Sequence, residues 1–256
     1  MTPNTAVFLS IRDKATRLPG KATLDVCGKP VIARLLRRLE QVREANLTVL
    51  TTSTNAHDEH LIARARTAGI ETFAGSEDDK LQRYLDAARA FDVDFAVVVD
   101  GDDLFFSVNH IDAAIRHYRK SGADYISQTG LPLGAASFGI RTVALAQVVA
   151  VKAESNTEVW GEYFTSRPDF QIALLEETDP LLRQPSVRMT LDYPEDLDFF
   201  RAVYEQYDDE GEPTLREVMT ILQSHPQITE INRAAQGKYE TNLKSAIPVR
   251  SRRAPS

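Results

Sequence analysis

The chain has 256 residues, of which 43% are hydrophobic and 26% charged, a composition typical of a globular protein rather than a disordered or fibrous one. Its formal net charge of −7 argues against a nucleic-acid partner, because holding a nucleic-acid backbone needs a concentrated basic surface. Cys27 is the only cysteine, which excludes an intrachain disulfide framework, and no apolar run approaches the roughly 18 residues of a membrane span, so we expect one principal cytoplasmic domain.

Strand-like and helix-like patterns alternate along the first half of the chain. The expected elements are strand 6–11, helix 31–42, strand 47–52, helix 61–68, strand 95–99 and helix 111–118. This alternation implies a mainly parallel sheet with helices on both faces, and such sheets bind ligands at the carboxyl ends of their strands. We therefore predict an α/β fold in which functional residues follow strands.

The pattern is less regular in the second half of the chain. The expected elements there are strands 137–142, 171–176 and 187–191 and helices near 158–166, 194–207 and 214–223. We interpret 128–186 as an inserted region for acceptor binding and dimer formation, within one domain that spans 1–236. The polar stretch 237–256 has little to bury and predicts a mobile basic tail.

The loop after the first strand is rich in cations. Arg12, Lys14, Arg17 and Lys21 lie close together in a chain that is acidic overall, and their mutual repulsion is relieved when an anion is bound. Gly20 would let backbone N–H groups approach phosphate oxygens closely. The loop matches neither the Walker motif nor the dinucleotide-binding glycine fingerprint. Triphosphate binding explains the cluster, and a solvated basic turn is the alternative.

Acidic residues follow two of the predicted strands. Asp100, Asp102 and Asp103 come directly after the buried strand 95–99, and Asp192 follows the strand-like run 187–191. Carboxylates at the end of a strand suit Mg²⁺, which takes one or two protein carboxylates and fills its other positions with phosphate oxygens and water. The alternatives are an Asp-Gly turn for the first group and a helix cap for Asp192.

In combination these segments resemble the spore-coat-polysaccharide type of cytidylyltransferase, which is related to the CMP-Kdo and CMP-sialic acid synthetases. The matching segments, in family order, are IRDKATRLPGK, CGKPVIARLLRRL, FAGSEDDKLQRYLDAA, VVVDGDD, SGADYIS and VRMTLDYPEDLDFF. The resemblance implies a GT-A-like (Rossmann-like) nucleotidyltransferase fold and a homodimer. It also implies transfer of CMP from CTP to a small sugar-like acceptor, with Mg²⁺ as cofactor and release of pyrophosphate.

The resemblance further implies roles for individual residues. Those expected to bind the nucleotide are Arg12, Arg17, Gly20 and Lys21 at the triphosphate and Ser53, Gly75 and Ser76 at the base or ribose. Asp102 and Asp192 are expected to bind the metal. Of this set, Arg12, Arg17, Lys21 and Asp102 would be catalytic, because nucleotidyl transfer depends on alignment and charge neutralisation.

The acceptor side departs from the family pattern. The segment around Trp160 differs from that of relatives, and Asp103 follows Asp102 where the family usually has cysteine. We expect Lys80, Arg141 and Arg188 to bind an anionic acceptor such as a sugar acid or a sugar phosphate. Transfer of another nucleotide, from GTP or UTP, and a non-catalytic nucleotide-binding role are the alternatives.

Overall fold

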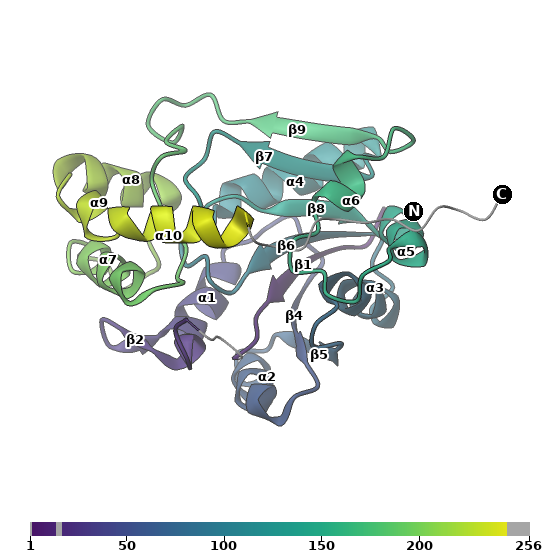
Figure 1. Ribbon diagram of the computed structural model, residues 1–256, viewed down its shortest axis with the longest axis horizontal. Helices are drawn as coiled ribbons and strands as arrows, with labels where there is room; N and C mark the ends of the chain where they lie inside the picture. The colour runs from purple at the N-terminus through teal and green to yellow at the C-terminus, as the bar shows by residue number, and fades with distance from the viewer. Residues whose placement is uncertain (1, 14–16, 245–256) are drawn as a thin grey trace.

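The computed structural model describes residues 2–13 and 17–244, built around one seven-stranded sheet (Figure 1). The strands, in the order in which they lie side by side, are β5 (Glu71–Gly75), β4 (Leu47–Ser53), β1 (Thr5–Ser10), β6 (Phe95–Asp100), β8 (Phe138–Arg141), β7 (Tyr125–Thr129) and β9 (Ile172–Glu176). Of these strands β8 alone runs antiparallel to its neighbours. The prediction of an α/β fold with a mainly parallel sheet is confirmed.

Helices cover both faces of the sheet. The helical segments are η1 (Lys21–Thr23), α1 (Val31–Leu39), η2 (Ala56–Asp58), α2 (Glu59–Thr67), α3 (Lys80–Ala90), α4 (Val108–Ser121), α5 (Thr142–Val151), α6 (Glu162–Thr165), α7 (Pro194–Tyr204), α8 (Leu215–Ser224), α9 (Ile228–Ile231) and α10 (Arg233–Lys244). A short ribbon of β2 (Asp25–Val26) and β3 (Lys29–Pro30) precedes α1. In Figure 1 the helices α7 to α10 gather at the left, whereas α3, α5 and α6 lie at the right.

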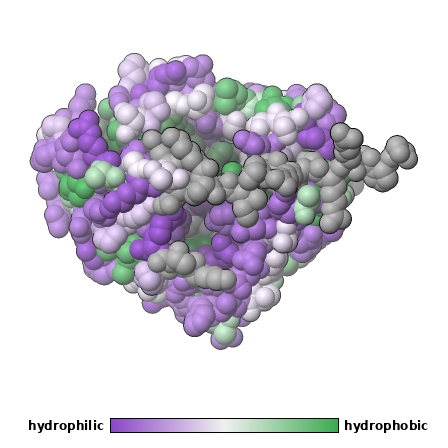
Figure 2. Space-filling view, viewed as in Figure 1, coloured by the Kyte–Doolittle hydropathy of each residue, from purple (hydrophilic) through white to green (hydrophobic). Residues whose placement is uncertain are grey.

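The central strands β1 and β6 are mainly apolar because both faces of the sheet are buried there. In β1, Val7 and Leu9 belong to a core shared with α1, α4, α7 and α8, whereas Ala6 and Phe8 belong to a core shared with α3, α5 and α6. Hydrophilic side chains predominate on the molecular face that Figure 2 shows. No described helix is long and apolar enough to span a bilayer.

The second half of the chain differs from the sequence-based prediction in three places. Within the expected insert 128–186, β8 and β9 are strands of the central sheet itself. The expected strand 187–191 makes only an isolated bridge between Arg188 and Leu133. The expected tail needs correction over 237–244, because these residues continue helix α10, which is anchored by the buried Ala235. The remainder, 245–256, lies outside the described residues.

Candidate active site

The strand order reverses between β1 and β6, which places a crevice at the carboxyl ends of these two strands. Ser10 and Asp100 end the strands in register, and the Gly101 N–H donates to the Ser10 carbonyl at 2.8 Å. A Cβ at Gly101 would lie only 2.5 Å from Ile11 Cγ1. Glycine therefore lets the loop that carries Asp102 press against the loop that follows β1.

The segment before α7 is held beside the same loop by backbone hydrogen bonds. The Leu191 N–H donates to the Asp102 carbonyl at 2.8 Å, and the Met189 N–H donates to the Leu133 carbonyl at 2.7 Å. Gly134 is required here, since its φ is +89° and a Cβ would lie 2.3 Å from the Met189 carbonyl oxygen. These contacts bring Asp192 to the cavity that Asp102 lines.

A buried network below this segment fixes Asp192. The Asp196 carboxylate accepts from the backbone N–H groups of Asp192 and Tyr193, at 3.0 Å each. Arg188 Nε donates to Asp196 at 2.8 Å, and Arg188 Nη2 lies 3.2 Å from Asp192. Burial alone would lower the pKa of Arg188, but Asp196 and Asp192 outweigh it and raise the pKa. Arg188 is thus a buried structural cation, which corrects its expected role in acceptor binding.

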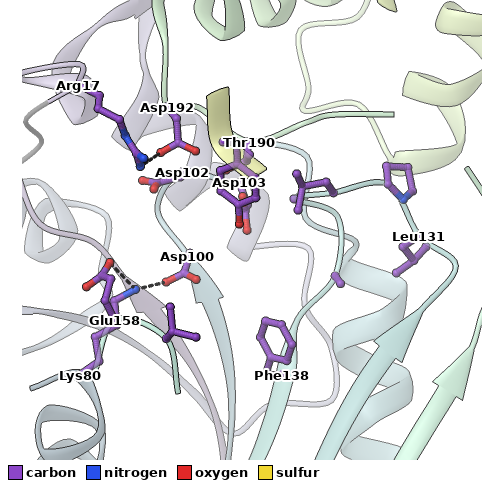
Figure 3. A pocket seen from close by; sticks show the side chains of 16 residues that line it. Arg17, Lys80, Asp100, Asp102, Asp103, Leu131, Phe138, Glu158, Thr190 and Asp192 are labelled. Atoms are coloured by element: carbon purple, nitrogen blue, oxygen red, sulfur yellow. Dashed lines mark hydrogen bonds and ion pairs between the residues drawn. The ribbon is translucent and has the colours of Figure 1, made fainter. Parts of the chain in front are cut away.

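Two cations of the first loop contact the two aspartates expected to bind metal. Lys21 Nζ lies 2.5 Å from Asp102 Oδ1. Arg17 Nη2 lies 2.7 Å from Asp192 Oδ1, as Figure 3 shows. Lys21 is only 9% exposed. The expected triphosphate ligands and the expected metal ligands therefore meet at one place, although they are some 80 to 175 residues apart along the chain.

Arg17, Asp102 and Asp192 border a cavity of about 470 Å³ with one charged and one apolar wall. Figure 3 shows the charged side chains grouped on one side and Phe138 and Leu131 on the other. The charged wall comprises Arg17, Lys80, Asp100, Asp102, Asp103, Glu158 and Asp192, and the apolar wall includes Leu131, Pro132, Leu133, Ala136, Phe138 and Val159. Thr190 and Tyr239 complete the lining. Such a shape suits a small molecule with an apolar face and a charged end.

A second group of charged side chains lies at the carboxyl end of β6. Lys80 Nζ lies 3.2 Å from both Asp100 Oδ1 and Glu158 Oε1, and Arg12 Nη2 donates to Glu158 at 2.9 Å. Burial would lower the pKa of Lys80, but Asp100 and the other nearby acids outweigh it and raise the pKa. Likewise, burial would raise the pKa of Glu158, but Lys80 and Arg12 outweigh it and lower the pKa. Glu158 therefore stays ionised and pairs with Arg12, which is expected at the triphosphate, and with Lys80, which is expected at the acceptor.

Asp103 is in a different electrostatic state from its neighbours. Burial, followed by the charges of Asp100 and Asp102, raises its pKa well above the ordinary value. A raised pKa favours the protonated carboxyl, which can donate a hydrogen bond. Asp103 therefore lines the cavity as a candidate hydrogen-bond donor.

The other expected site residues lie outside this cavity. Ser53 ends β4 beside Gly75, and its hydroxyl donates to Asp58 at 2.5 Å. Ser76 follows Gly75, and its carbonyl accepts from the buried Arg83 at 2.5 Å. These three residues continue the carboxyl edge of the sheet away from β1. Gly20, with φ 67°, begins η1 in the left-handed region just before Lys21.

Arg141 is at the wrong end of the sheet for acceptor binding. It pairs in register with Phe95, the first residue of β6, whereas the cavity lies beyond Asp100, the last residue of that strand. Its guanidinium instead lies 3.3 Å from Asp124. Arg141 thus lies apart from the cavity that Asp102 and Asp192 line, and its expected contact with the acceptor is not part of this site.

Sequence analysis missed three features of the cavity. Glu158 lies in a segment whose departure from the family pattern concealed its pairing with Lys80. The turn 131–134, Leu-Pro-Leu-Gly, carries a local turn signal but no signal of its contact with 187–191. Tyr239 lies in a stretch expected to be a tail, although Ala235 and Tyr239 have the i, i+4 spacing of a helix face.

The described residues contain no group of three or more acidic, histidine or cysteine side chains arranged to hold a metal ion by themselves. The donors facing the cavity are instead a few carboxylates with neighbouring cations. Such a donor set fits Mg²⁺, which keeps several waters and takes phosphate oxygens from a bound nucleotide. Asp102 and Asp192 are the aspartates of the lining that pair with Lys21 and Arg17 of the first loop.

Comparison with known proteins agrees with this geometry. Residues 6–208 match the family described as cytidylyltransferase. The spore coat polysaccharide biosynthesis protein SpsF of Bacillus subtilis is 24% identical over 225 residues, which cover 86% of this chain and 94% of that protein. A cytidylyltransferase structure from Leptospira borgpetersenii aligns with TM-score 0.79 and 20% identity, over 89% of this chain and 97% of that chain. A CMP:2-keto-3-deoxy-manno-octonic acid synthetase solved with CTP aligns with TM-score 0.62 and 15% identity, over 79% and 98%. The chain belongs to the cytidylyltransferase family.

Proposed function

We propose that this protein transfers CMP from CTP to a small sugar-like acceptor and releases pyrophosphate, in the synthesis of activated sugars for polysaccharides. The observation that carries the proposal is the meeting of Arg17 and Lys21 with Asp102 and Asp192 at one cavity. Family membership and the names of relatives that act in polysaccharide and CMP-sugar synthesis support it.

The first-loop cations would neutralise the triphosphate. Lys21 and Arg17 each pair with an aspartate, and the phosphate oxygens of a bound nucleotide would offer them charge-assisted hydrogen bonds. Arg12 pairs with Glu158 in a similar way, at 2.9 Å, and would assist the departing pyrophosphate. Because the acceptor oxygen attacks the α-phosphorus in line, alignment and charge neutralisation are what the protein must supply.

Asp102 and Asp192 would hold Mg²⁺. Both carboxylates border the cavity. Lys21 and Arg17 would turn from them to the phosphates of a bound nucleotide, whereas the buried Arg188 would stay beside Asp192. A bound Mg²⁺ would supply charge neutralisation at the phosphates and lower the pKa of the acceptor hydroxyl. Arg188 and Asp196 keep Asp192 in position from below, as a buried pair 2.8 Å apart.

The acceptor would bind between the charged and the apolar walls. Lys80 is the expected acceptor ligand that reaches this cavity, where it is paired with Asp100 and Glu158. Arg17 is the other cation of the lining. An acceptor with a single anionic group, a sugar acid or a sugar phosphate, would match Lys80, while its ring carbons would pack on Phe138.

The decisive experiment measures pyrophosphate release with CTP, UTP, GTP and ATP, with and without Mg²⁺, across a panel of carboxylated and phosphorylated sugars. We expect release with CTP and Mg²⁺ and one class of acceptor. Preference for another nucleotide would overturn the donor assignment but leave the family assignment intact. No release with any nucleotide and acceptor would favour a non-catalytic nucleotide-binding role.

Asp102→Asn tests the metal assignment. Losing one preorganised charge typically costs a factor of about 10² to 10³ in turnover, and the same replacement keeps the size of the side chain. We therefore expect turnover to fall by about that factor, with the circular dichroism spectrum and melting temperature little changed. Asp198→Asn, at a carboxylate that is 64% exposed, is the matched control and should keep full turnover. Near-normal turnover in Asp102→Asn would rule out the assignment.

We also propose that two copies associate through the edge strand β9. Its outer face carries Ile172 and Leu174, which are 37% and 63% exposed, and an edge strand offers unpaired backbone groups to a partner. Leu174→Lys should shift the protein from dimer to monomer in light scattering coupled to gel filtration. Val143→Lys removes another exposed apolar residue, 55% exposed, away from β9 and should leave the dimer intact. An unchanged mass for Leu174→Lys would exclude this interface.

A further inference from the structure

A second cavity, of about 690 Å³, lies where the end of α1 meets the beginnings of α4 and α8. Its lining includes Arg38, Arg43, Ser107, Val108 and Leu215. None of these residues lines the cavity of the candidate active site. The features of this second cavity are therefore not explained by nucleotidyl transfer.

Arg38 is the unusual residue of this cavity. It is 1% exposed, and its Nε and Nη2 atoms have no hydrogen-bond partner within the described part of the chain. Its guanidinium carbon lies 5.5 Å and 5.7 Å from the ring centroids of Phe105 and Phe106. These rings cover the cation without satisfying its donors. A buried charge without a partner is costly, so Arg38 is expected to meet an anion.

The neighbouring Arg34 shows how α1 treats a buried arginine that has a structural role. Arg34 is 4% exposed, lies 3.2 Å from the Glu212 carboxylate and donates to the Val26 carbonyl at 2.6 Å and 2.9 Å. One helical turn later, Arg38 is buried more deeply and has no comparable partner in the described structure. Unlike Arg34, Arg38 therefore has guanidinium donors, Nε and Nη2, that no acceptor in the described structure meets.

The carboxylates of the cavity are committed elsewhere. Glu44 pairs with two arginines of α4, at 3.2 Å and 2.5 Å. Asp112 accepts from two backbone N–H groups before β4, at 3.1 Å and 3.0 Å. Glu40 is exposed at the end of α1, and no ion pair joins it to Arg38 among residues 2–13 and 17–244. The charge of Arg38 is therefore not neutralised from within the cavity.

Two helix amino ends border the same space, and that of α8 already carries a capping box formed by Thr214 and Glu217. The first turns of α4, 14 residues long, and of α8, 10 residues long, contribute Val108 and Leu215 to the lining. The first N–H groups of a helix have no partner within the helix, and the helix dipole favours an anion there. Ser107 begins α4 without a side-chain cap hydrogen bond, so its first turn is open to an external acceptor.

We propose that this second cavity is an anion site, in which Arg38 and the uncapped amino end of α4 bind a small phosphate-bearing molecule. The unpaired guanidinium supplies charge, and the backbone N–H groups supply directional donors. Arg43 at the rim supplies a further cation to draw the ligand in. The site is independent of the proposed nucleotidyl transfer, and it stands or falls separately from it.

The test is a titration of the full-length protein with inorganic phosphate, followed by ¹H–¹⁵N resonances and by equilibrium dialysis. We expect the amide resonances of Val108, Asn109 and Leu215 to move and saturate together. Binding at the candidate active site is read separately from the Gly101 amide, so the two sites are distinguished. Parallel titrations with pyrophosphate and with a sugar monophosphate show whether a bare anion or a larger phosphate ester binds more tightly. Saturable binding of either ligand at these amides supports the site.

Arg38→Met is the main variant, and Arg37→Met is its control. Methionine has a similar length without charge, and replacing an unpaired buried cation by an apolar side chain should preserve folding. We expect phosphate affinity at this site to fall about tenfold or more, as for loss of charge-assisted hydrogen bonds. Arg37 is the exposed neighbour and changes the net charge equally, so Arg37→Met should bind as the unaltered protein does.

Two outcomes would overturn the site. One is a phosphate titration that leaves the Val108 and Leu215 amides unmoved; the other is equal affinity in Arg38→Met and Arg37→Met. If Arg38→Met does not fold, Arg43→Gln decides the matter, because Arg43 is exposed and its replacement should leave folding intact. A severalfold loss of affinity in Arg43→Gln supports the site, and an unchanged affinity counts against it.

Discussion

The lack of a side chain at Gly101 lets the two loops of the candidate active site pack closely against each other. Gly101 has no Cβ, and an added one would lie within 2.7 Å of three carbon atoms of Ile11. The loop that carries Asp102 can therefore follow β6 directly while remaining hydrogen-bonded to the end of β1. The position of the Asp102 carboxylate therefore depends on how closely the backbones of these two loops pack.

Gly101→Ala should separate these loops. Relief of the overlap requires a backbone or side-chain shift, and overpacking of this kind typically costs about 1–3 kcal/mol. We expect urea unfolding to show a loss in that range, together with reduced turnover, because Asp102 moves with the loop. Gly237→Ala is the control: nothing lies within 4 Å of its added Cβ in α10, so it should be neutral or up to about 1 kcal/mol more stable.

A double variant identifies the clash as the cause. Ile11→Ala removes the carbon atoms that the new Cβ would meet, at its own cost in buried apolar contact. If the overlap causes the damage, the combined loss in Ile11→Ala with Gly101→Ala will be smaller than the sum of the single losses. Strict additivity would mean that Gly101 acts in some other way.

At the level of elements, the carboxylate of Asp196 joins α7 to the segment before it. Asp196 is 0% exposed and forms part of a capping box at the start of α7. It also accepts from Asn232, which follows α9, at 3.0 Å. One side chain thus connects α7, the end of α9 and the turn that positions Asp192.

Asp196→Ala should be strongly destabilising. Removal of one partner leaves Arg188 buried with its charge poorly compensated, and breaking a buried pair in this way costs about 3–5 kcal/mol. We expect that loss in denaturant unfolding. Asp198→Ala, two residues later on the same helix, removes an exposed carboxylate 3.6 Å from Arg201 and should cost less than about 1 kcal/mol. Comparable losses in the two variants would contradict a central role for Asp196.

The sequence predicted elements where hydrophobic periodicity was strong and failed where tertiary contacts decide the structure. The spacing of apolar residues indicates which side chains are buried in two such elements, the run 95–99 and the helix that starts at Val31. The segment 187–191 has a strand-like composition, yet its backbone pairs with Leu133 and Asp102 outside the regular sheet. No local pattern indicates that arrangement, because the partners are some 55 and 90 residues away.

The dependence on tertiary contacts also explains which residues of the candidate site could be predicted from the sequence. Arg17, Lys21, Asp102 and Asp192 were predictable because each follows a recognisable strand or motif. Glu158 was not, since only the fold brings it to Lys80. Arg188 was assigned to the acceptor because an arginine near a site suggests an anion, but sequence does not reveal that Asp196 already neutralises it.

At the scale of the whole molecule, His110 connects the beginning of α4 with the segment after β9. Its Nε2 lies 3.0 Å from Glu177, and its Nδ1 lies 2.7 Å from the Ser107 hydroxyl. Burial lowers the pKa of His110 below its ordinary value of 6.5, against the opposing influence of Glu177. The folded protein therefore favours neutral His110 more than the unfolded chain does.

This difference predicts how stability depends on pH. A histidine with a lowered folded-state pKa contributes stability that is present above its unfolded pKa, near 6.5, and is lost as pH falls through the folded value. The free energy of unfolding of the unaltered protein, minus that of His110→Gln, should therefore decrease as the pH falls below about 6.5. Urea unfolding of both proteins at pH values from about 8 to 5 measures this difference, and groups that titrate alike in both proteins cancel. His57→Gln makes the same exchange at an exposed histidine and is the control for the substitution itself. A difference for His110→Gln that stays constant or grows toward low pH would mean that its neutral form is not the one the fold prefers.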